Sequence, residues 1–173
     1  MKVYLRKAEP RDLAAIMEII GEARVALAQR GIPQWLGESG PNEGQMKQDL
    51  EDQTCYVLIL EQEIAGVGVV SHEIEEAYEY LLSGAWQPGA TSYASIHRFA
   101  VSQSHQGKGL ALLLLRFLVT AAALVGDVDI RIDTHPANQI MQKVIQRAGF
   151  SYVGELALDI PHGERYGYQL WLE

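Results

Sequence analysis

The sequence is poor in cysteine and in positive charge. Its 173 residues contain one cysteine, Cys55, which excludes an internal disulfide and suits a reducing cytoplasm. Cys55 lies in the apolar run CYVLILE, which favours a buried strand thiol over a nucleophile. Lys and Arg number 14 against 22 Asp and Glu, and the resulting net charge of −8 argues against a nucleic-acid partner.

The sequence also lacks membrane-spanning and secretory segments. The most apolar run, Leu110–Val125, is shorter than the about 20 residues that a membrane helix needs, and Arg116 interrupts it. The N-terminus has no continuous apolar core of the kind found in signal peptides. We therefore expect a cytoplasmic protein with no membrane partner.

No internal repeat, low-complexity segment or long linker divides the chain, so we expect one domain over residues 1–173. The spacing of apolar residues predicts several strands, over residues 2–8, 55–72 (a hairpin), 93–101, 129–135, 150–158 and 165–173. It predicts helices that start near Pro10 and cover Glu43–Asp52, Gly109–Val125 and Pro136–Gly149. The segment 93–135 reads strand–helix–strand, which predicts one right-handed parallel crossover. The fold class is α+β, an α/β sandwich with a mixed, mostly antiparallel sheet flanked by helices.

A glycine-rich turn precedes the leucine-rich helix and is the strongest chemical signal in the sequence. Lys108 is followed by Gly109 and not by Ser or Thr, which excludes a Walker-type phosphate loop, and Leu112 replaces the third glycine of a dinucleotide fingerprint. The remaining pattern is Q-x-x-G-x-A, formed by Gln106, Gly107, Lys108, Gly109, Leu110 and Ala111. Glycines let the backbone approach a ligand, and N–H groups at a helix N-terminus favour a phosphate. The alternative is a glycine-rich connection that binds nothing.

The segments FAVSQSHQGKGLALLLLRFL and DIRIDTHPANQIMQKVIQRAGFSYVGEL resemble the acetyl-CoA-binding stretch of the GNAT (Gcn5-related) N-acetyltransferase family. This resemblance covers about Tyr93 to Leu156. It implies a sheet that splays between the family's fourth and fifth strands. It also implies an enzyme that uses acetyl-CoA as co-substrate and moves the acetyl group to a primary amine of a small molecule or peptide, by direct transfer in a ternary complex. No metal is expected, and a homodimer is possible because dimers are common in the family.

The resemblance also assigns residues to the cofactor. Residues 106–111 would hold the pyrophosphate of CoA, and Phe99, Ala100 and Val101 would pair with its pantetheine arm. Asn138 matches an asparagine that contacts this arm, although it is equally explained as a residue that starts a helix. Many family members protonate the departing thiolate with a tyrosine, and here Ile145 stands in its place. Tyr152 could substitute, but a buried strand tyrosine is the plainer interpretation.

Two histidines are candidates for the general base that the amine requires, since an unperturbed histidine titrates near ~6.5. His97 lies on the strand that would pair with the pantetheine arm, and His135 ends the following strand. A structural, hydrogen-bonded histidine is the alternative for each.

The acceptor would be bound by the variable segments GIPQW and 73–93. We expect Trp35, Tyr78, Tyr80 and Trp86 to form walls. The glutamates of the second segment could attract a cationic amine or merely form a solvated face. Arg165 could hold an acceptor carboxylate or pair across a hairpin.

Two other functions remain open. One is a catalytically weak GNAT-like sensor that binds acyl-CoA, which the missing tyrosine favours. The other is a scaffold with an empty glycine turn.

Overall fold

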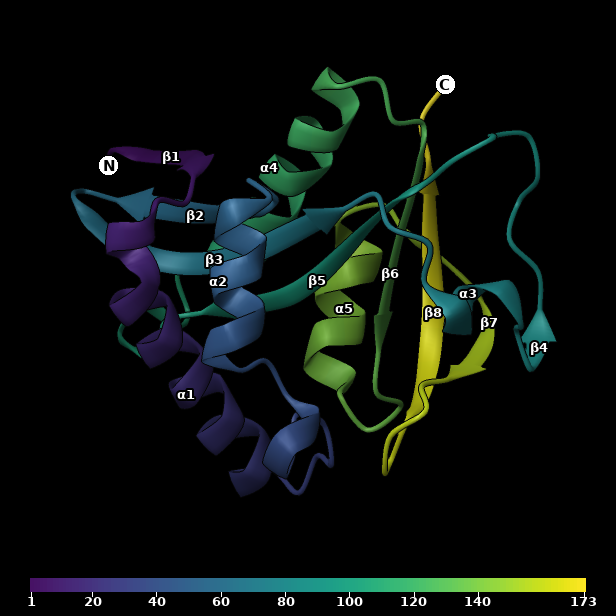
Figure 1. Ribbon diagram of the computed structural model, residues 1–173, viewed down its shortest axis with the longest axis horizontal. Helices are drawn as coiled ribbons and strands as arrows, with labels where there is room; N and C mark the ends of the chain where they lie inside the picture. Colours follow the sequence, from purple (N-terminus) through teal and green to yellow (C-terminus); the bar gives the residue numbers. More distant parts are fainter.

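The computed structural model describes residues 1–173, which form a single sheet of eight strands with helices on both faces (Figure 1). The strands are β1 (Val3–Lys7), β2 (Cys55–Leu60), β3 (Glu63–Ser71), β4 (Ser83–Gly84), β5 (Ala94–Val101), β6 (Asp129–Thr134), β7 (Ser151–Ala157) and β8 (Glu164–Trp171). Their order in the sheet is β1-β2-β3-β5-β6-β8-β7-β4. Only β5 and β6 are parallel neighbours, which confirms the expected mixed α+β fold.

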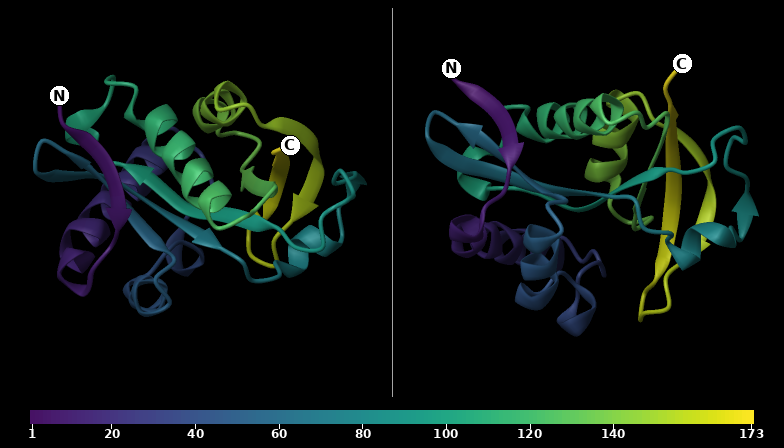
Figure 2. Two further views of the ribbon diagram at one scale, coloured as in Figure 1. Left: turned by 90° about the horizontal axis from the view of Figure 1, so that it is seen from above. Right: turned by 45° about the horizontal axis from the view of Figure 1, so that its top comes forward.

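The helices form two layers. Helices α1 (Leu13–Gln29) and α2 (Glu43–Glu51) cover one face, while α4 (Leu110–Leu124) and α5 (Gln139–Arg147) cover the other (Figure 2). A one-turn helix α3 (Glu76–Glu79) and three 3₁₀ turns (Pro10–Asp12, Gly37–Ser39 and Gln103–His105) lie in the connections. None of the helices has the length and apolar character that crossing a bilayer requires.

Each helical layer has its own apolar core. Under α4 and α5, sixteen buried residues form one cluster, and α4 contributes to it mainly through leucines: Leu110, Leu114, Leu115, Leu118 and also Ala122. Under α1 and α2, twelve buried residues form the second cluster. Burial of a leucine contributes about 1.5–3 kcal/mol, so the leucine-rich run is accounted for as the core of a folded domain.

Strands β5 and β6 pair only over their first half. The parallel register runs from Ala94 opposite Ile130 to Ile96 opposite Ile132, and residues 97–101 of β5 have no partner on the β6 side. On its other side β5 stays paired with β3 as far as Val101. A register shift opposite Val67/Val69 coincides with Arg98, whose φ of 50° lies in the left-handed region. The sheet therefore splays where the family resemblance places the splay, and the fourth strand of the family corresponds to β5 here.

The segment 73–93 contains more structure than its sequence indicates. It forms α3 and then the two-residue strand β4, which pairs antiparallel with β7. Gly84 and Gly154 meet at this pair so closely that a Cβ on either would overlap a backbone oxygen of the other strand. Tyr78 and Tyr93 of this segment form a third small core with Leu156 of β7.

Candidate active site

The glycine turn presents a row of free backbone N–H groups. Gly107 and Gly109 have φ angles of 77° and 73°, which residues with a side chain rarely adopt. No hydrogen bond within the protein uses the N–H groups of residues 107–112, whereas the N–H of Gln106 donates to the Gln103 carbonyl at 3.2 Å. The free N–H groups therefore begin at Gly107, one residue after the start of the Q-x-x-G-x-A pattern at Gln106. They lie at the N-terminus of α4, where the helix dipole favours an anion.

A cavity of about 360 Å³ opens between the splayed strands and beneath α1. Its walls come from α1, the loop after α1, β5, β6, α5 and the β7–β8 connection, with single residues from α2, α4, β8 and the segment before α3. Six of the ten residues assigned to the cofactor line this cavity: Phe99, Ala100, Val101, Gln106, Ala111 and Asn138. The other four, residues 107–110, form the turn between Gln106 and Ala111 and are not part of the lining.

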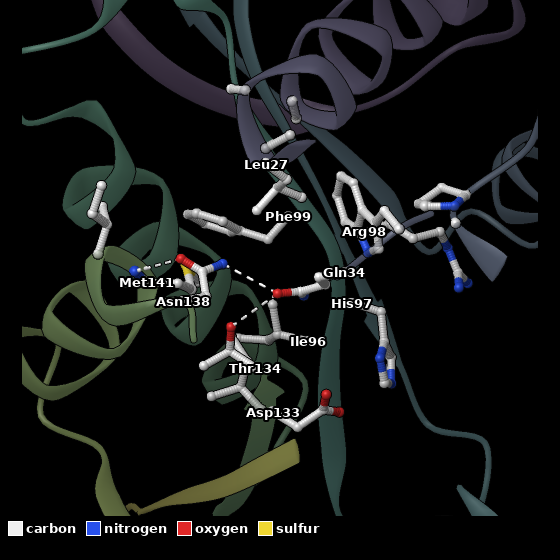
Figure 3. A pocket seen from close by; sticks show the side chains of 18 of the residues that line it. Leu27, Gln34, Ile96, His97, Arg98, Phe99, Asp133, Thr134, Asn138 and Met141 are labelled. Atoms are coloured by element: carbon white, nitrogen blue, oxygen red, sulfur yellow. Dashed lines mark hydrogen bonds between the residues drawn. The ribbon is translucent and has the colours of Figure 1, made fainter. Parts of the chain in front are cut away.

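Asn138 both caps a helix and reaches across the cavity. Its Oδ1 accepts a hydrogen bond from the Met141 N–H at 3.2 Å, which makes it the N-cap of α5. Its Nδ2 donates to Gln34 Oε1 at 3.2 Å, and the same oxygen lies 3.4 Å from Thr134 Oγ1 (Figure 3). Both earlier interpretations of Asn138 therefore remain open. Gln34 was not identified from the sequence, because only the fold brings the loop after α1 to the end of β6.

His97 is the only histidine that lines the cavity. Its Nε2 lies 2.7 Å from Ser95 Oγ and 3.2 Å from Glu75 Oε1, and no hydrogen bond of the protein uses its Nδ1. The hydrogen bond from His97 lowers the pKa of Glu75, although burial opposes this effect. A ring held through Nε2, with Nδ1 unpaired, can accept a proton from a molecule in the cavity.

His135 is buried outside the cavity lining. Its Nδ1 accepts a hydrogen bond from the Ala137 N–H at 3.0 Å. Its Nε2 lies 3.3 Å from Glu164 Oε1, an ion-pair distance, yet the geometry is not that of a hydrogen bond. Burial lowers the pKa of His135. The structure thus brings one of the two candidate bases to the cavity and leaves the other beside it.

The predicted acceptor residues fall into two groups. Trp35 and Arg165 line the cavity, whereas Tyr78, Tyr80 and Trp86 do not. Tyr80 is 76% exposed, and Trp86 stacks on Arg131, whose Cζ lies 4.4 Å from the Trp86 ring centroid. The buried Tyr78 donates its hydroxyl hydrogen bond to Asp133 at 2.7 Å.

Two charged cavity residues, Arg98 and Asp133, were not identified from the sequence, whereas Glu75 belongs to the glutamates that were expected to attract a cationic amine. Glu75, Arg98 and Asp133 line the cavity together with His97 and Arg165. No local pattern marks Arg98 or Asp133 as a site residue, and the splay of β5 from β6 is what brings these charges to one space.

Two residues that bear on the chemistry lie outside this space. Ile145 is buried within the α4–α5 core, and Tyr152 is half-exposed and absent from the cavity lining. Cys55 is buried on β2, and desolvation raises its pKa to about 12, so it stays an unreactive thiol.

The free amides of the glycine turn and the splayed parallel strands beside them are the features that the family resemblance implies for an acetyltransferase. The model of the acetyltransferase (GNAT) family matches residues 22–150, and the chain belongs to this family. A GNAT family acetyltransferase from Streptococcus agalactiae shares 32% identity, with a TM-score of 0.90 over 99% of this chain and 96% of that chain.

Two further matches are a solved structure with the same fold and a curated protein that matches part of the chain. A putative acetyltransferase from Salmonella typhimurium, solved with its cofactor acetyl-CoA, has the same fold at 17% identity, with a TM-score of 0.70 over 100% of this chain and 95% of that chain. GCN5-related N-acetyltransferase 6, chloroplastic, of Arabidopsis thaliana is 30% identical over 79 residues, or 46% of this chain. The match spans only 27% of the length of that curated relative.

Proposed function

We propose that residues 1–173 form one N-acetyltransferase domain that moves the acetyl group of acetyl-CoA to a primary amine of a small molecule or peptide. The transfer is direct, within a ternary complex, because the one thiol of the chain is buried and its pKa is raised. The observation that carries the proposal is the row of unused N–H groups over residues 107–112, next to the unpaired edge of β5. The reducing conditions that suit a lone thiol favour the cytoplasm.

The residues present fit acetyl-CoA in two places. The N–H groups of residues 107–112 donate to a diphosphate without losing any bond of the protein, and Lys108 adds a positive charge in the same turn. The edge of β5 over residues 97–101 offers backbone groups to the amides of the pantetheine arm.

The chemistry divides between the co-substrate and the chain. When bound, acetyl-CoA supplies an acetyl group activated as a thioester. The unpaired edge of β5 orients this group, and a backbone N–H there stabilises negative charge that develops on the carbonyl oxygen. His97 takes the proton that the amine must lose, through its free Nδ1, while Ser95 and Glu75 hold the ring at Nε2. Ile145 has no proton to donate, so the CoA thiolate leaves without being protonated from this position.

Ile145 also favours a second function, a sensor that binds acyl-CoA without turnover. Calorimetric titration with acetyl-CoA, followed by a thiol-release assay over an amine panel, separates the possibilities. Binding with thiol release that depends on an amine supports the proposal. Binding without release by any amine indicates the sensor, and absence of binding indicates an empty scaffold.

Replacement of Gly109 tests the phosphate site. Gly109→Trp should weaken acetyl-CoA binding by about 100-fold or more, because losing two hydrogen bonds to a charged group costs roughly 3 kcal/mol. Gly126→Trp is the matched control at the other end of α4, since Gly126 also has a positive φ (99°) and open space at its Cβ. Titration calorimetry of both variants gives the answer: equal affinities would refute the site.

A further inference from the structure

Arg165 is a buried arginine whose hydrogen-bonding capacity is only partly used. The residue is 3% exposed and lines the cavity. Its Nη1 donates to the carbonyls of His162 at 2.9 Å and Glu164 at 2.8 Å, which fixes the guanidinium against its own hairpin. No hydrogen bond of the protein uses Nε or Nη2, and the nearest carboxylate oxygen, Asp133 Oδ1, lies 3.4 Å from Nε.

Two other arginines show what this edge of a guanidinium normally binds. Arg98 donates from Nε and Nη2 to the two oxygens of Asp49, at 2.6 and 2.8 Å. Arg131 uses the same two nitrogens to hold Asp129, with Nη2 at 2.7 Å. A carboxylate matches the Nε/Nη2 edge with two parallel hydrogen bonds. In Arg165 this edge makes no hydrogen bond to a carboxylate, and its one acidic contact is the ion pair between Nε and Asp133 Oδ1 at 3.4 Å.

The charge of Arg165 is also incompletely compensated. Burial is the main influence on its pKa and lowers it, so the ion gives up more solvation than its partners restore. Asp133 is shared, because its Oδ2 accepts the hydrogen bond from Tyr78 at 2.7 Å. Glu164, the other acidic neighbour, is 57% exposed and lies beside His135.

The site that would bind a carboxylate lies in the same cavity as the candidate base. Tyr78 connects the two, since its hydroxyl binds Asp133 and its ring centroid lies 6.3 Å from that of His97. Figure 3 shows His97 and Asp133 in one part of the cavity, with Asn138 and Met141 across from them beyond Gln34. The negative charges of Glu75 and Asp133 would attract the protonated amine of an acceptor in this cavity. The positive charge of Arg165 would attract its carboxylate.

We propose that the acceptor is a small amine that also carries a carboxylate, of the amino acid type, and that the Nε/Nη2 edge of Arg165 binds this carboxylate. This inference rests on the proposed acetyl transfer and names its substrate class. The cavity of about 360 Å³ also receives the reactive end of the co-substrate, which favours a small acceptor.

The wild-type protein can be tested with pairs of acceptors that differ only in the carboxylate. Thiol release from acetyl-CoA is measured with common amino acids, with their carboxamides and with polyamines. We expect kcat/KM to be roughly 10- to 100-fold higher for an amino acid than for its amide, as for a bidentate charged hydrogen bond. The amine of the amide is less basic and reacts more readily, so without a carboxylate site the preference would be reversed.

Binding gives a second readout that does not depend on turnover. Calorimetric titration of the best amino acid and its amide, in the presence of CoA, should show the same preference. In Arg165→Met the affinity ratio of acid to amide should fall to about one and the kcat/KM preference should be reversed, while acetyl-CoA affinity is retained. Arg165→Lys should recover only part of it, because lysine supplies charge without the planar fork. Arg147→Met, which removes an exposed arginine outside the cavity lining, is the control and should keep the wild-type ratio.

The outcomes separate this inference from the proposed function. Amides or polyamines acetylated as well as amino acids would overturn the inference and leave acetyl transfer standing. So would acetyl-CoA binding with no amino acid bound or acetylated, or a ratio that Arg165→Met does not change. Failure to bind acetyl-CoA would contradict the proposed function itself. If Arg165→Met does not fold, the wild-type comparison of acid and amide decides alone.

Discussion

His97 differs from the other four histidines in its access to the cavity, and no hydrogen bond of the protein uses its Nδ1. The sequence could place it on the correct strand, because the strand and the glycine turn are close in the chain. It could not show that Glu75 and Ser95 hold the ring, since the segment with Glu75 carries no motif. The strand position of His97 was therefore predictable, while its partners were not.

Substitution of His97 tests its role as the base. His97→Gln should lower kcat by about 10²-fold or more, the usual contribution of a general base, with acetyl-CoA affinity unchanged. The measurement is steady-state thiol release as a function of pH, alongside calorimetry. A variant with wild-type kcat and an unaltered pH profile would assign His97 a purely structural role.

His135 predicts a pH dependence of stability. Burial lowers its pKa below the ordinary value of 6.5, so the proton binds the unfolded chain more readily. The contribution of this residue is complete above about pH 6.5 and is lost as the pH falls through its pKa in the folded state. Denaturant titrations between about pH 5 and 7 should show this loss, and His135→Asn should remove it. The same slope in both proteins would contradict the assignment.

At the scale of elements, the irregularity of β5 at Arg98, a β-bulge, is stabilised by a contact with helix α2. Arg98 adopts a φ of 50° inside a strand, which costs a residue with a side chain about 1–2 kcal/mol. Its bidentate pair with Asp49 ties this strained residue to α2. The position where β5 leaves β6 therefore depends on a contact between elements that are distant in the sequence.

Removal of Asp49 should relax this bulge. Asp49→Ala leaves Arg98 without its partner, and we expect about 2–3 kcal/mol lower stability, less than for a fully buried pair because Arg98 is 24% exposed. Acetyl-CoA affinity should also fall, because the free edge of β5 starts at this bulge. Lys47→Ala, which breaks the exposed Glu43–Lys47 pair on the same helix, should leave both quantities nearly unchanged. Chemical denaturation and calorimetry measure the two; equal effects of both substitutions would contradict the role of the bulge.

For the segment 73–93, the sequence pattern did not predict which side chains face the cavity. Its glutamates and aromatics indicated an acceptor wall, but Trp86 and Tyr80 lie outside the cavity lining. The Trp86 Nε1–H donates to the Tyr78 carbonyl at 2.8 Å, and its ring covers Arg131. Long-range contacts of this kind follow from the completed sheet and not from the local pattern.

At the scale of the whole molecule, the sequence predicted the layers and the crossover. Apolar periodicity locates elements, and the crossover rule fixes the hand of the β5–α4–β6 unit. The glycine turn was predictable because glycine allows the positive φ angles of the turn, and the groups that would bind the ligand are backbone N–H groups of the same residues. The cavity was not, because its walls combine α1, β5, β6, α5 and the β7–β8 connection, and only the packed sheet brings these together.

The central claim is that the backbone N–H groups of residues 107–112 bind the diphosphate of acetyl-CoA. Its most direct test is titration of the ¹⁵N-labelled protein with acetyl-CoA, followed by ¹H–¹⁵N correlation spectra. We predict that the amide protons of residues 107–112 move downfield and shift more than those elsewhere, as donors to an anion do. Saturating acetyl-CoA that leaves these amides unmoved would contradict the account.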